Sequence, residues 1–328
     1  MSAARVVTFG ELMLRLSPPG TQRLFEAPEL RADFGGCEAN VAVGLAHLGV
    51  RADYVTRLPD NVIGDAALRA LAAEGVGTAW IARGPERMGI YYVEPGADIG
   101  ANRVVYDRAG SAFAGVTADT IDWARALAGA AWLHGSGITP ALGEGPRAAL
   151  AAAIRTARAA GAAVSVDLNY RPALWQGRDP RAVIEQLVRE ADLLIANRDA
   201  VRTMLGVDTS PADDASLALR LADQYGFRRV ALTRREVRSA SEHRWSASLY
   251  DAASRTTSDS RRHDVRVVDR VGGGDSFAAG LIAALLRGSP GPEAVEFGAA
   301  VGALKLGVPG DWSRASPQDV EQLLRACA

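Results

Sequence analysis

The stretch 269–280 reads Asp-Arg-Val-Gly-Gly-Gly-Asp-Ser-Phe-Ala-Ala-Gly, and it carries the strongest structural signal in the chain. An extended run at 264–268 leads into three glycines, and a helical pattern follows at once. Glycines let backbone N–H groups turn together toward one point, and a helix N-terminus adds a partial positive charge there. The stretch therefore predicts an anion-binding turn with Asp275 in the first helical turn beside it.

Three interpretations of this turn compete. A dinucleotide-binding fingerprint needs Gly-x-Gly-x-x-Gly, and Gly272 and Gly274 fit it, but Phe277 occupies the third glycine position. A tight structural turn with an ordinary acidic helix start is the second. The third makes Gly272, Gly273 and Gly274 a cradle for a transferring phosphoryl group, while Asp275 accepts the proton of an attacking hydroxyl. We favour the third, because phosphoryl transfer needs little beyond positioning and charge stabilisation.

Outward from this turn, short β-branched runs alternate with longer helical stretches. Strands are expected at 5–10, 51–56, 131–134, 163–167, 191–195 and 229–233, and helices at 38–48, 62–74, 145–160, 180–189, 213–225, 273–287, 293–307 and 316–327. This alternation is typical of an α/β fold with a doubly wound, mostly parallel sheet and helices on both faces. No internal repeat is visible, and we expect a single domain spanning residues 1–328.

Two regions interrupt the alternation. Residues 12–34 are rich in Pro and Gly, and residues 88–112 contain two extended runs, 89–94 and 103–108, around a Gly-rich turn. We expect these regions to build a small β lid, since a small sheet that interrupts an α/β core often covers a site or forms an interface. A surface hairpin without a function is the alternative.

The composition excludes several classes of function. The chain has 328 residues, 48% of them hydrophobic, and 37 Lys and Arg residues balance 38 Asp and Glu residues. This balance favours neither nucleic acid nor a membrane surface as a partner. Lys305 is the sole lysine and is followed by Leu306, so the Gly-Lys-Ser/Thr of a Walker-type loop is absent. Schiff-base chemistry would depend on that one residue.

The cysteines and the N-terminal sequence indicate a cytoplasmic protein. Cys37 and Cys327 are too few for a disulfide framework or a multi-cysteine metal site. The first residues lead directly into a strand pattern without a secretory apolar region, and no apolar run approaches the ~20 residues of a membrane span.

Two motifs at opposite ends of the chain carry a family resemblance. The stretch 269–277 resembles the C-terminal signature of the ribokinase-like (PfkB-type) carbohydrate kinases, and Gly-Gly-Cys-Glu-Ala-Asn-Val-Ala at 35–42 resembles their N-terminal signature. The resemblance implies a ribokinase-like doubly wound sheet with a β lid. It also implies ATP-dependent phosphorylation of a sugar, with Mg²⁺.

Within that family the chain is most similar to the 2-keto-3-deoxygluconate kinases. The similarity rests on segments 15–20, 105–112, 167–171, 239–241, 245–247 and 308–312. It implies phosphorylation of a primary hydroxyl of 2-keto-3-deoxygluconate. A fructokinase, a ribokinase or a 2-keto-3-deoxygalactonate kinase is the nearer alternative, and a non-catalytic sugar- or nucleotide-binding regulator is the more distant one. A lid sheet also suggests a homodimer or a higher homo-oligomer.

The resemblance implies a set of substrate contacts around Asp275. An acid sugar carries a carboxylate, which an arginine fork recognises well. Arg108 and Arg171 are the candidates for that fork, and each is otherwise an ordinary surface charge. The full set of expected substrate contacts is Gly35, Gly36, Asn40, Tyr91, Tyr106, Arg108, Arg171 and Asp275.

The resemblance also implies nucleotide contacts, which are Asn197, Thr233, Arg235, Gly272, Gly274, Ala299 and Ala300. Asp269 matches a position near a monovalent cation or the substrate in relatives. We expect Mg²⁺ to be held mainly by the phosphates of ATP and by water. One departure concerns the family's Asn-x-x-Glu run, which here reads Asn197-Arg198-Asp199-Ala200. Ala200 occupies the acidic position, and Asp199 is the candidate substitute.

Overall fold

A long twisted sheet forms the middle layer of the protein. The computed structural model describes residues 4–20, 22–26, 28–94, 96, 103–210, 213–239 and 241–326. Within these residues the sheet has ten strands, in the order β13-β12-β11-β10-β9-β8-β1-β4-β5, with β14 paired to β12. The strands are β1 (Arg5–Phe9), β4 (Arg51–Pro59), β5 (Ile81–Gly84), β8 (Trp132–Ser136), β9 (Ala163–Asp167), β10 (Leu193–Ala196), β11 (Arg229–Val237), β12 (Glu242–Asp251), β13 (Thr256–Asp259) and β14 (His263–Arg266).

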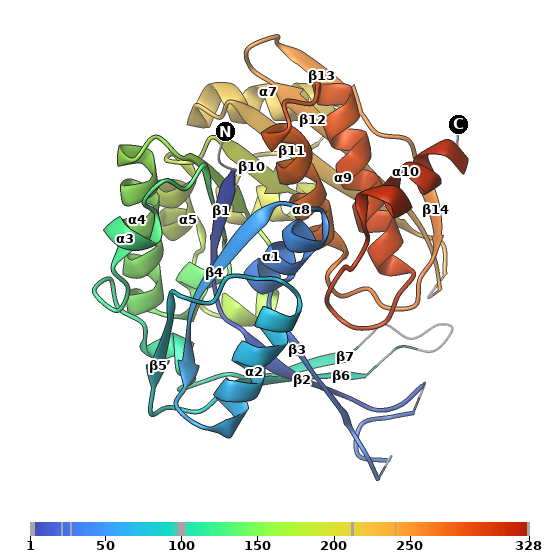
Figure 1. Ribbon diagram of the computed structural model, residues 1–328. Helices are drawn as coiled ribbons and strands as arrows, with labels where there is room; N and C mark the ends of the chain where they lie inside the picture. The colour runs from blue at the N-terminus through green and yellow to red at the C-terminus, as the bar shows by residue number, and fades with distance from the viewer. Residues whose placement is uncertain are drawn as a thin grey trace.

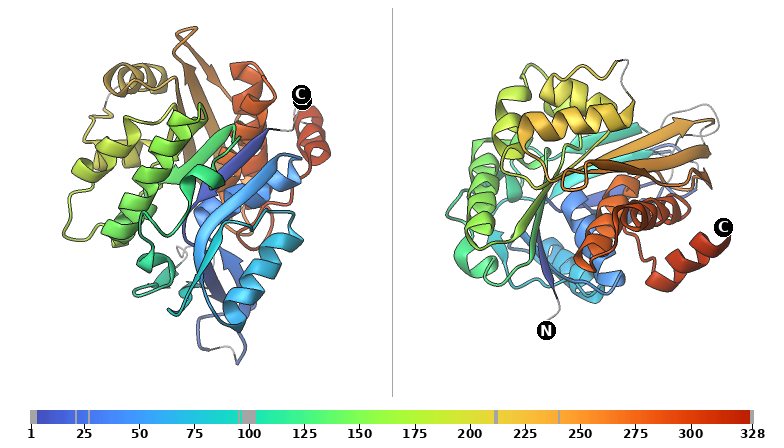
Figure 2. Two further views of the ribbon diagram at one scale, coloured as in Figure 1. Left: turned by 60° about the vertical axis from the view of Figure 1, so that its left-hand side comes forward. Right: turned by 90° about the horizontal axis from the view of Figure 1, so that it is seen from above.

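Helices cover both faces of this sheet, as the view from above shows (Figure 2). They are α1 (Cys37–His47), α2 (Val62–Ala73), α3 (Trp123–Ala126), α4 (Glu144–Ala159), α5 (Arg181–Val188), α6 (Arg198–Ala200), α7 (Asp214–Tyr225), α8 (Gly273–Leu286), α9 (Gly291–Leu306) and α10 (Pro317–Ala326). Helices α1, α2, α8 and α9 share one hydrophobic core, and α3, α4, α5 and α7 share the other. Side chains of β1 point to both faces of the sheet, so that Val6 packs into the first core and Val7 and Phe9 pack into the second.

The sheet is parallel from β11 through β10, β9, β8, β1 and β4 to β5. This confirms the doubly wound α/β fold, and each strand and helix expected from the sequence has a counterpart within a few residues. The carboxyl ends of parallel strands meet at one edge, where open α/β sheets bind ligands. Figure 1 shows a second, small sheet at that edge, below the ends of β1 and β4.

The small sheet is built from the two regions that interrupt the alternation. Its order is β3-β2-β6-β7, with β2 parallel to β6 and the other pairs antiparallel. The strands are β2 (Met13–Ser17), β3 (Arg31–Gly35), β6 (Gly89–Glu94) and β7 (Arg103–Asp107). Tyr91 and Val93 of β6 pack with Met13 of β2 in a separate small core.

The antiparallel edge of the main sheet was not expected from the sequence. Strand β12 pairs with β11 over nine residues, from Arg229 opposite Asp251 to Val237 opposite His243. Serine, alanine and charged residues fill much of β12, so its local strand propensity is weak. The pairing itself makes it a strand, because strand preference depends on cross-strand neighbours more than on the isolated residue.

No helix in the part of the chain that the structure describes has the length and apolar character needed to cross a bilayer. The free thiol of Cys37 lies at the start of α1, and Cys327 lies outside the described residues.

Helices α8 and α9 pack with their backbones in close approach. A Cβ placed on Gly280 of α8 would lie 2.9 Å from the Cα of Gly298 and 2.9 Å from the Cγ2 of Val301, both in α9. Backbone atoms at such a distance have to move apart. Because α8 begins with the glycine-rich turn, this contact also sets where that turn lies.

We expect Gly280→Ala to lower the free energy of unfolding by about 1–3 kcal/mol, the usual cost of overpacking a core, partly offset by the better helix propensity of alanine. Gly291→Ala is the matched control, since a Cβ at this first residue of α9 meets only the Oγ of Ser258, at 3.4 Å. Urea denaturation of both variants measures the difference. Equal stability of the two variants would contradict the close approach of α8 and α9.

Candidate active site

The glycine-rich turn combines a constrained backbone with an open face. Gly272 has φ +82°, a left-handed conformation, and a Cβ there would overlap the carbonyl oxygen of Asp311. A Cβ on Gly273 would lie 2.9 Å from Leu306 Cδ2. In contrast, no atom lies within 4 Å of the Cβ position of Gly274, which is exposed. The turn is therefore open to solvent at Gly274, and an anion-binding turn at a helix N-terminus needs such an accessible position.

Asp275 lies buried at the start of α8, and Asn40 of α1 holds its carboxylate. The Oδ1 of Asn40 accepts from the Gly36 backbone N–H at 3.3 Å, which leaves the amide Nδ2 directed toward α8. That Nδ2 donates to Asp275 Oδ2 at 2.7 Å and to Asp311 Oδ2 at 3.4 Å. The structure thus joins the two signature motifs through one side-chain amide, although they lie 235 residues apart.

The position of Asp275 alters its acidity. Burial raises the pKa of Asp275 to about 7; the Asn40 hydrogen bond and the charge of Arg171 oppose the rise, and the charges of Asp167 and Asp311 add to it. Burial likewise raises the pKa of Asp167, at the end of β9, to about 6. A carboxylate with a pKa near neutrality is suited to accept a proton and to release it again.

A buried charge cluster lies directly behind the turn. Arg15 of β2 donates from its two terminal nitrogens to Asp311 Oδ1 and Asp269 Oδ2, each at 2.6 Å. Asp269 also accepts from the backbone N–H groups of Val271, at 3.0 Å, and Gly310, at 3.1 Å. Asp269 therefore fixes the turn through Arg15 and two backbone amides. Neither Arg15 nor Asp311 has a local sequence pattern that predicts this role, although both lie in segments that carry the family resemblance.

The small sheet brings aromatic side chains to the same place. A Cβ on Gly35, at the end of β3, would overlap both the Asp311 carboxylate and the Tyr91 hydroxyl. That hydroxyl is buried and has no well-formed hydrogen bond among the described residues. The rings of Tyr91 and Tyr106 stack with their centroids 6.1 Å apart. Of the residues expected to contact substrate, Gly35, Asn40 and Tyr91 thus meet at Asp311.

Gly36 and Arg108 both lie against Glu11, Gly36 at its backbone carbonyl and Arg108 at its buried carboxylate. A Cβ on Gly36 would overlap the Glu11 carbonyl oxygen. Arg108 donates from its Nε to Glu11 Oε2 at 2.7 Å, and Ser111 Oγ donates to Oε1 at 2.5 Å. The Arg108 guanidinium also lies over the Tyr106 ring, 5.6 Å from its centroid. Arg108 is therefore held at the edge of the small sheet, and sequence reasoning had not identified Glu11 as its partner.

Three arginines form a positive region near Asp275. Partial desolvation opposes the charge on Arg171, but Tyr106 and Asp275 more than offset it, so its pKa is raised. Burial lowers the pKa of Arg235 on β11, and the neighbouring charges of Arg270 and Arg171 lower it further. Arg171 and Arg235 form no ion pair with any carboxylate in the described part of the chain. Arg171 and Arg235 are thus like charges close to each other and without a carboxylate partner among the described residues, an arrangement suited to bind an anion.

The remaining four nucleotide candidates have contacts with other parts of the fold. Ala299 and Ala300 are fully buried within the core shared by α8 and α9. The Asn197 side chain caps α6 and accepts from the Ala200 N–H at 2.9 Å, while Thr233 donates to the Ala196 carbonyl at 3.4 Å. None of these contacts involves the glycine-rich turn, and the role of the four residues in nucleotide binding stays a prediction.

The alanine at position 200, where the family has an acidic residue, fits its surroundings in the structure. Ala200 is buried in the core on the α4 side of the sheet, where an acidic side chain would lack a partner. Asp199 is exposed and pairs with Arg202, one turn further on, at 2.7 Å. Among the described residues, no cluster of three or more His, Cys, Asp or Glu side chains is arranged to hold a metal ion.

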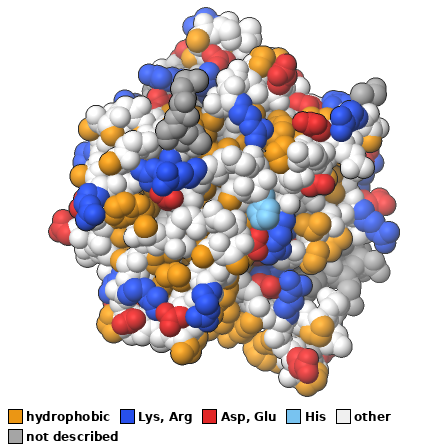
Figure 3. All heavy atoms as spheres, in the orientation of Figure 1, with side chains coloured by type: hydrophobic (Ala, Val, Ile, Leu, Met, Phe, Trp, Pro, Cys, Tyr) orange, Lys and Arg blue, Asp and Glu red, His pale blue; other side chains and the backbone are white. Residues whose placement is uncertain are grey.

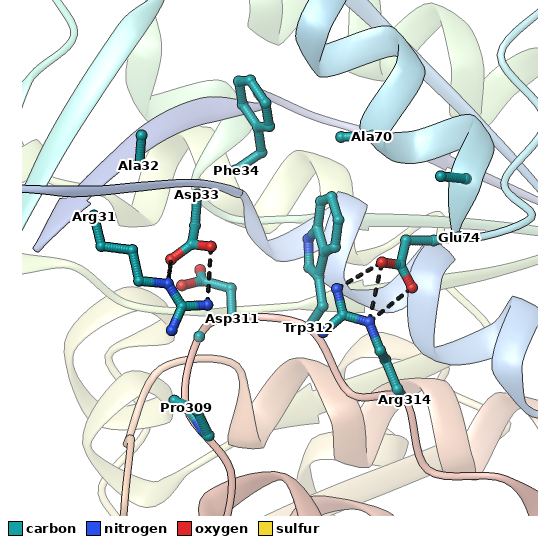
Figure 4. Close-up of a pocket in the computed structure, with 12 residues that line it drawn as sticks. Arg31, Ala32, Asp33, Phe34, Ala70, Glu74, Pro309, Asp311, Trp312 and Arg314 are labelled. Carbon is teal, nitrogen blue, oxygen red and sulfur yellow. Dashed lines mark hydrogen bonds and ion pairs between the residues drawn. The ribbon is translucent and has the colours of Figure 1, made fainter.

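A pocket of about 330 Å³ adjoins the charge cluster on its outer side (Figure 4). It is lined by β3, the end of α2 and the loop before α10, and Gly310 and Asp311 of that loop connect it with the charge cluster. Ion pairs flank it, with Arg31 bound to Asp33 at 2.7 Å and Arg314 to Glu74 at 2.6 Å. The face of the molecule in Figure 3 likewise shows charges of both signs interspersed.

The fold and this site define a class of protein: an α/β chain with an anion-binding helix start, a buried carboxylate beside it and a small sheet at the same edge. The family described as "pfkB family carbohydrate kinase" matches residues 3–318. The chain therefore belongs to the pfkB family of carbohydrate kinases.

Two relatives resemble it over almost their whole lengths. The crystal structure of 2-dehydro-3-deoxygluconokinase from Thermotoga maritima is 41% identical, with a TM-score of 0.95 and coverage of 98% of each chain. The 2-dehydro-3-deoxygalactonokinase of Haloferax volcanii is 35% identical over 98% of this chain and 97% of its own. A third relative, the 2-dehydro-3-deoxygluconokinase of Bacillus subtilis, is 30% identical over 93% of this chain and 90% of its own.

The buried carboxylate of Asp275 gives the stability of the fold a pH dependence. Its pKa of about 7 in the folded chain exceeds the ordinary 3.8, so the folded state binds more protons between about pH 4 and pH 7. This group therefore destabilises the fold as the pH rises through that window. We expect Asp275→Asn to become more stable than the unmodified protein over the same range, as measured by urea denaturation at several pH values.

Asp264→Asn is the matched control, because Asp264 is exposed and its pKa lies below 3.8 through its bond to Arg244. Its stability difference should stay constant between pH 4 and pH 7. A constant difference for Asp275→Asn as well would contradict the raised pKa.

Proposed function

We propose that this chain transfers the γ-phosphoryl group of ATP to a primary hydroxyl of 2-keto-3-deoxygluconate. The observation that carries the proposal is the Asp275 carboxylate, buried at the N-terminus of α8 with open space before Gly274 and a hydrogen bond from Asn40. In this arrangement a proton acceptor and an array of backbone donors face the same point.

The chemistry follows from the positions of these groups. Asp275 takes the proton of the attacking hydroxyl, for which its pKa of about 7 is suited. The backbone N–H groups at Gly272, Gly273 and Gly274 stabilise the negative charge on the transferring group. Arg235 is close enough to Arg171 and Arg270 for their charges to lower its pKa, and in this proposal the three supply counter-charge for the polyphosphate. Mg²⁺ bound to the phosphates of ATP supplies further charge neutralisation.

The acid sugar is favoured by arginines at the edge of the small sheet. A sugar carboxylate needs a guanidinium partner in a partly desolvated site. Arg171 lies near Asp275 and Tyr106, and Arg108 lies over the same Tyr106 ring. The names of the relatives from Thermotoga maritima and Bacillus subtilis support the same substrate.

A second candidate substrate is 2-keto-3-deoxygalactonate. The Haloferax volcanii relative, similar over 98% of this chain, is named a 2-dehydro-3-deoxygalactonokinase. The two sugars differ in stereochemistry at one carbon and share the carboxylate and the primary hydroxyl, so the groups described above serve either. Competition between the two sugars in one assay determines the preference.

The proposal also includes the expectations from the sequence about the lid, the cellular compartment, the oligomeric state and a monovalent cation. The small sheet acts as a lid that excludes water from the phosphoryl group. The chain works in the cytoplasm as a homodimer or higher oligomer, with no nucleic acid or membrane partner. A monovalent cation beside Asp269 stays a prediction, and it would have to share that carboxylate with Arg15 and two backbone amides.

We expect Asp275→Asn to lower kcat by about 10²–10⁴-fold, the usual contribution of a positioned base. In the unmodified enzyme, kcat/KM should fall as the pH drops below about 7, since protonation removes the acceptor. A coupled assay of ADP release measures both effects, with Asp264→Asn as control. Near-normal turnover by Asp275→Asn would contradict the assigned role.

We expect Arg108→Leu and Arg171→Leu each to raise KM for the acid sugar by about 10–100-fold, the value of a charged hydrogen bond. Activity toward neutral sugars such as fructose should change far less. The control is Arg87→Leu, which removes an exposed arginine paired with Asp107 of β7 at 2.6 Å. Equal losses on acid and neutral sugars would rule out the carboxylate fork.

A further inference from the structure

The sole lysine of the chain is fully buried behind the glycine-rich turn. Lys305 lies one residue before the end of α9 and has no exposed surface. Its Nζ donates to the Val308 carbonyl at 3.2 Å. Its Cε would lie 3.3 Å from a Cβ placed on Gly272, so the charged end of the side chain is next to the first residue of the turn. The chain thus holds an ammonium group against the back of the anion-binding backbone.

The local structure places Lys305 firmly. The Leu306 carbonyl accepts from the N–H groups of Val268, at 2.8 Å, and Asp269, at 3.3 Å, which ties the end of α9 to the segment entering the turn. Leu306 also packs against Gly273. A movement of Lys305 would therefore be passed directly to the glycines.

The charges around Lys305 show what it does electrostatically. Burial lowers its pKa, and the carboxylates of Asp269, Asp311 and Asp275 oppose this effect. It forms no direct ion pair with a described residue, and Arg15 occupies the space between Asp269 and Asp311. The three carboxylates of Asp269, Asp311 and Asp275 thus lie near two cations, Lys305 and Arg15. Without Lys305 the region would carry one positive charge less at the place a polyphosphate must approach.

A buried charge is costly for the fold. Desolvating an ammonium costs several kcal/mol, and an apolar side chain of the same volume is often equal or better for stability. Because Lys305 gains only one hydrogen bond in return, packing does not explain its presence. Its location near the anion-binding turn explains why a lysine occupies this position.

We propose that Lys305 is a built-in cation that positions the glycine-rich turn and supplies the positive charge behind it for binding the phosphates of a nucleotide. This rests on the proposed function and deepens it by adding a positioning residue. The charge acts through the turn, because the Lys305 Cε lies 3.3 Å from the Cβ position of Gly272 and a low-dielectric interior weakens a charge less than water does. An internal ammonium takes the place of the monovalent cation predicted beside Asp269, so the two predictions are alternatives and the salt dependence of the enzyme decides between them.

The test compares the isosteric variant Lys305→Met with the unmodified protein. We expect the affinity for a non-hydrolysable ATP analogue to fall by about 10–100-fold while that for adenosine is unchanged. The melting temperature should stay the same or rise. Arg287→Met is the control, since it removes a cation at the opposite end of α8, where Arg287 bonds the Leu48 carbonyl at 2.5 Å. An unchanged ratio of the two affinities, or a parallel loss of adenosine binding and stability, would overturn the proposal.

Small cations provide a second readout. The unmodified enzyme should show equal kcat in potassium, sodium and choline salts, and Lys305→Ala should regain several-fold activity with ammonium but none with choline. A potassium requirement of the unmodified enzyme, or no response of Lys305→Ala to ammonium, would overturn the built-in cation. If the unmodified protein releases no ADP with any sugar, the proposed kinase activity is wrong. The ratio of the affinities for the ATP analogue and for adenosine still decides the role of Lys305 in that case.

Discussion

The site depends on a carboxylate that is kept out of water at the start of a helix. Asp275 has its pKa raised to about 7 because burial disfavours its charge, and the Asn40 amide compensates only part of that cost. The hydrogen bond from Asn40 and the partial positive charge of the helix N-terminus make the buried group tolerable. The same features that make it tolerable also make it useful, since a carboxylate poised near neutrality can exchange a proton in either direction.

The fold supports this arrangement through close backbone packing. Gly280 lets α8 approach α9, while Gly272 lets the turn lie against the Asp311 carbonyl. Helix α1 brings Asn40 from the other end of the chain to the same point, and α1 packs into the same core as α8 and α9. Three helices on one face of the sheet thus determine the position of one carboxyl group, so a core substitution far from the site can alter its chemistry.

The sequence predicts the parts of this site that have a local pattern and misses those that depend on long-range contacts. The glycine-rich turn and the alternation of strands and helices are visible because each has a short period or a short motif. The bonds from Arg15 to Asp269 and Asp311 span 254 and 296 residues, and no local pattern records them. Strand β12 was missed for a similar reason, since its pairing with β11 and not its composition makes it extended. The small residues Ala299 and Ala300 suit close helix packing as well as a nucleotide, and the structure buries both.

Apart from Lys305, every Lys or Arg position of this chain is an arginine. The lysine behind the turn has a geometric reason. Arginine suits the open positions, where its planar fork can engage carboxylates or phosphates from the side. Behind the turn, Gly272 lies against the end of Lys305, Leu306 packs against Gly273, and the Val308 carbonyl accepts the single hydrogen bond. A guanidinium there would need a planar group of several atoms in a space that holds one ammonium, and its additional N–H groups would need partners. A compact point charge is the cation that such a space admits.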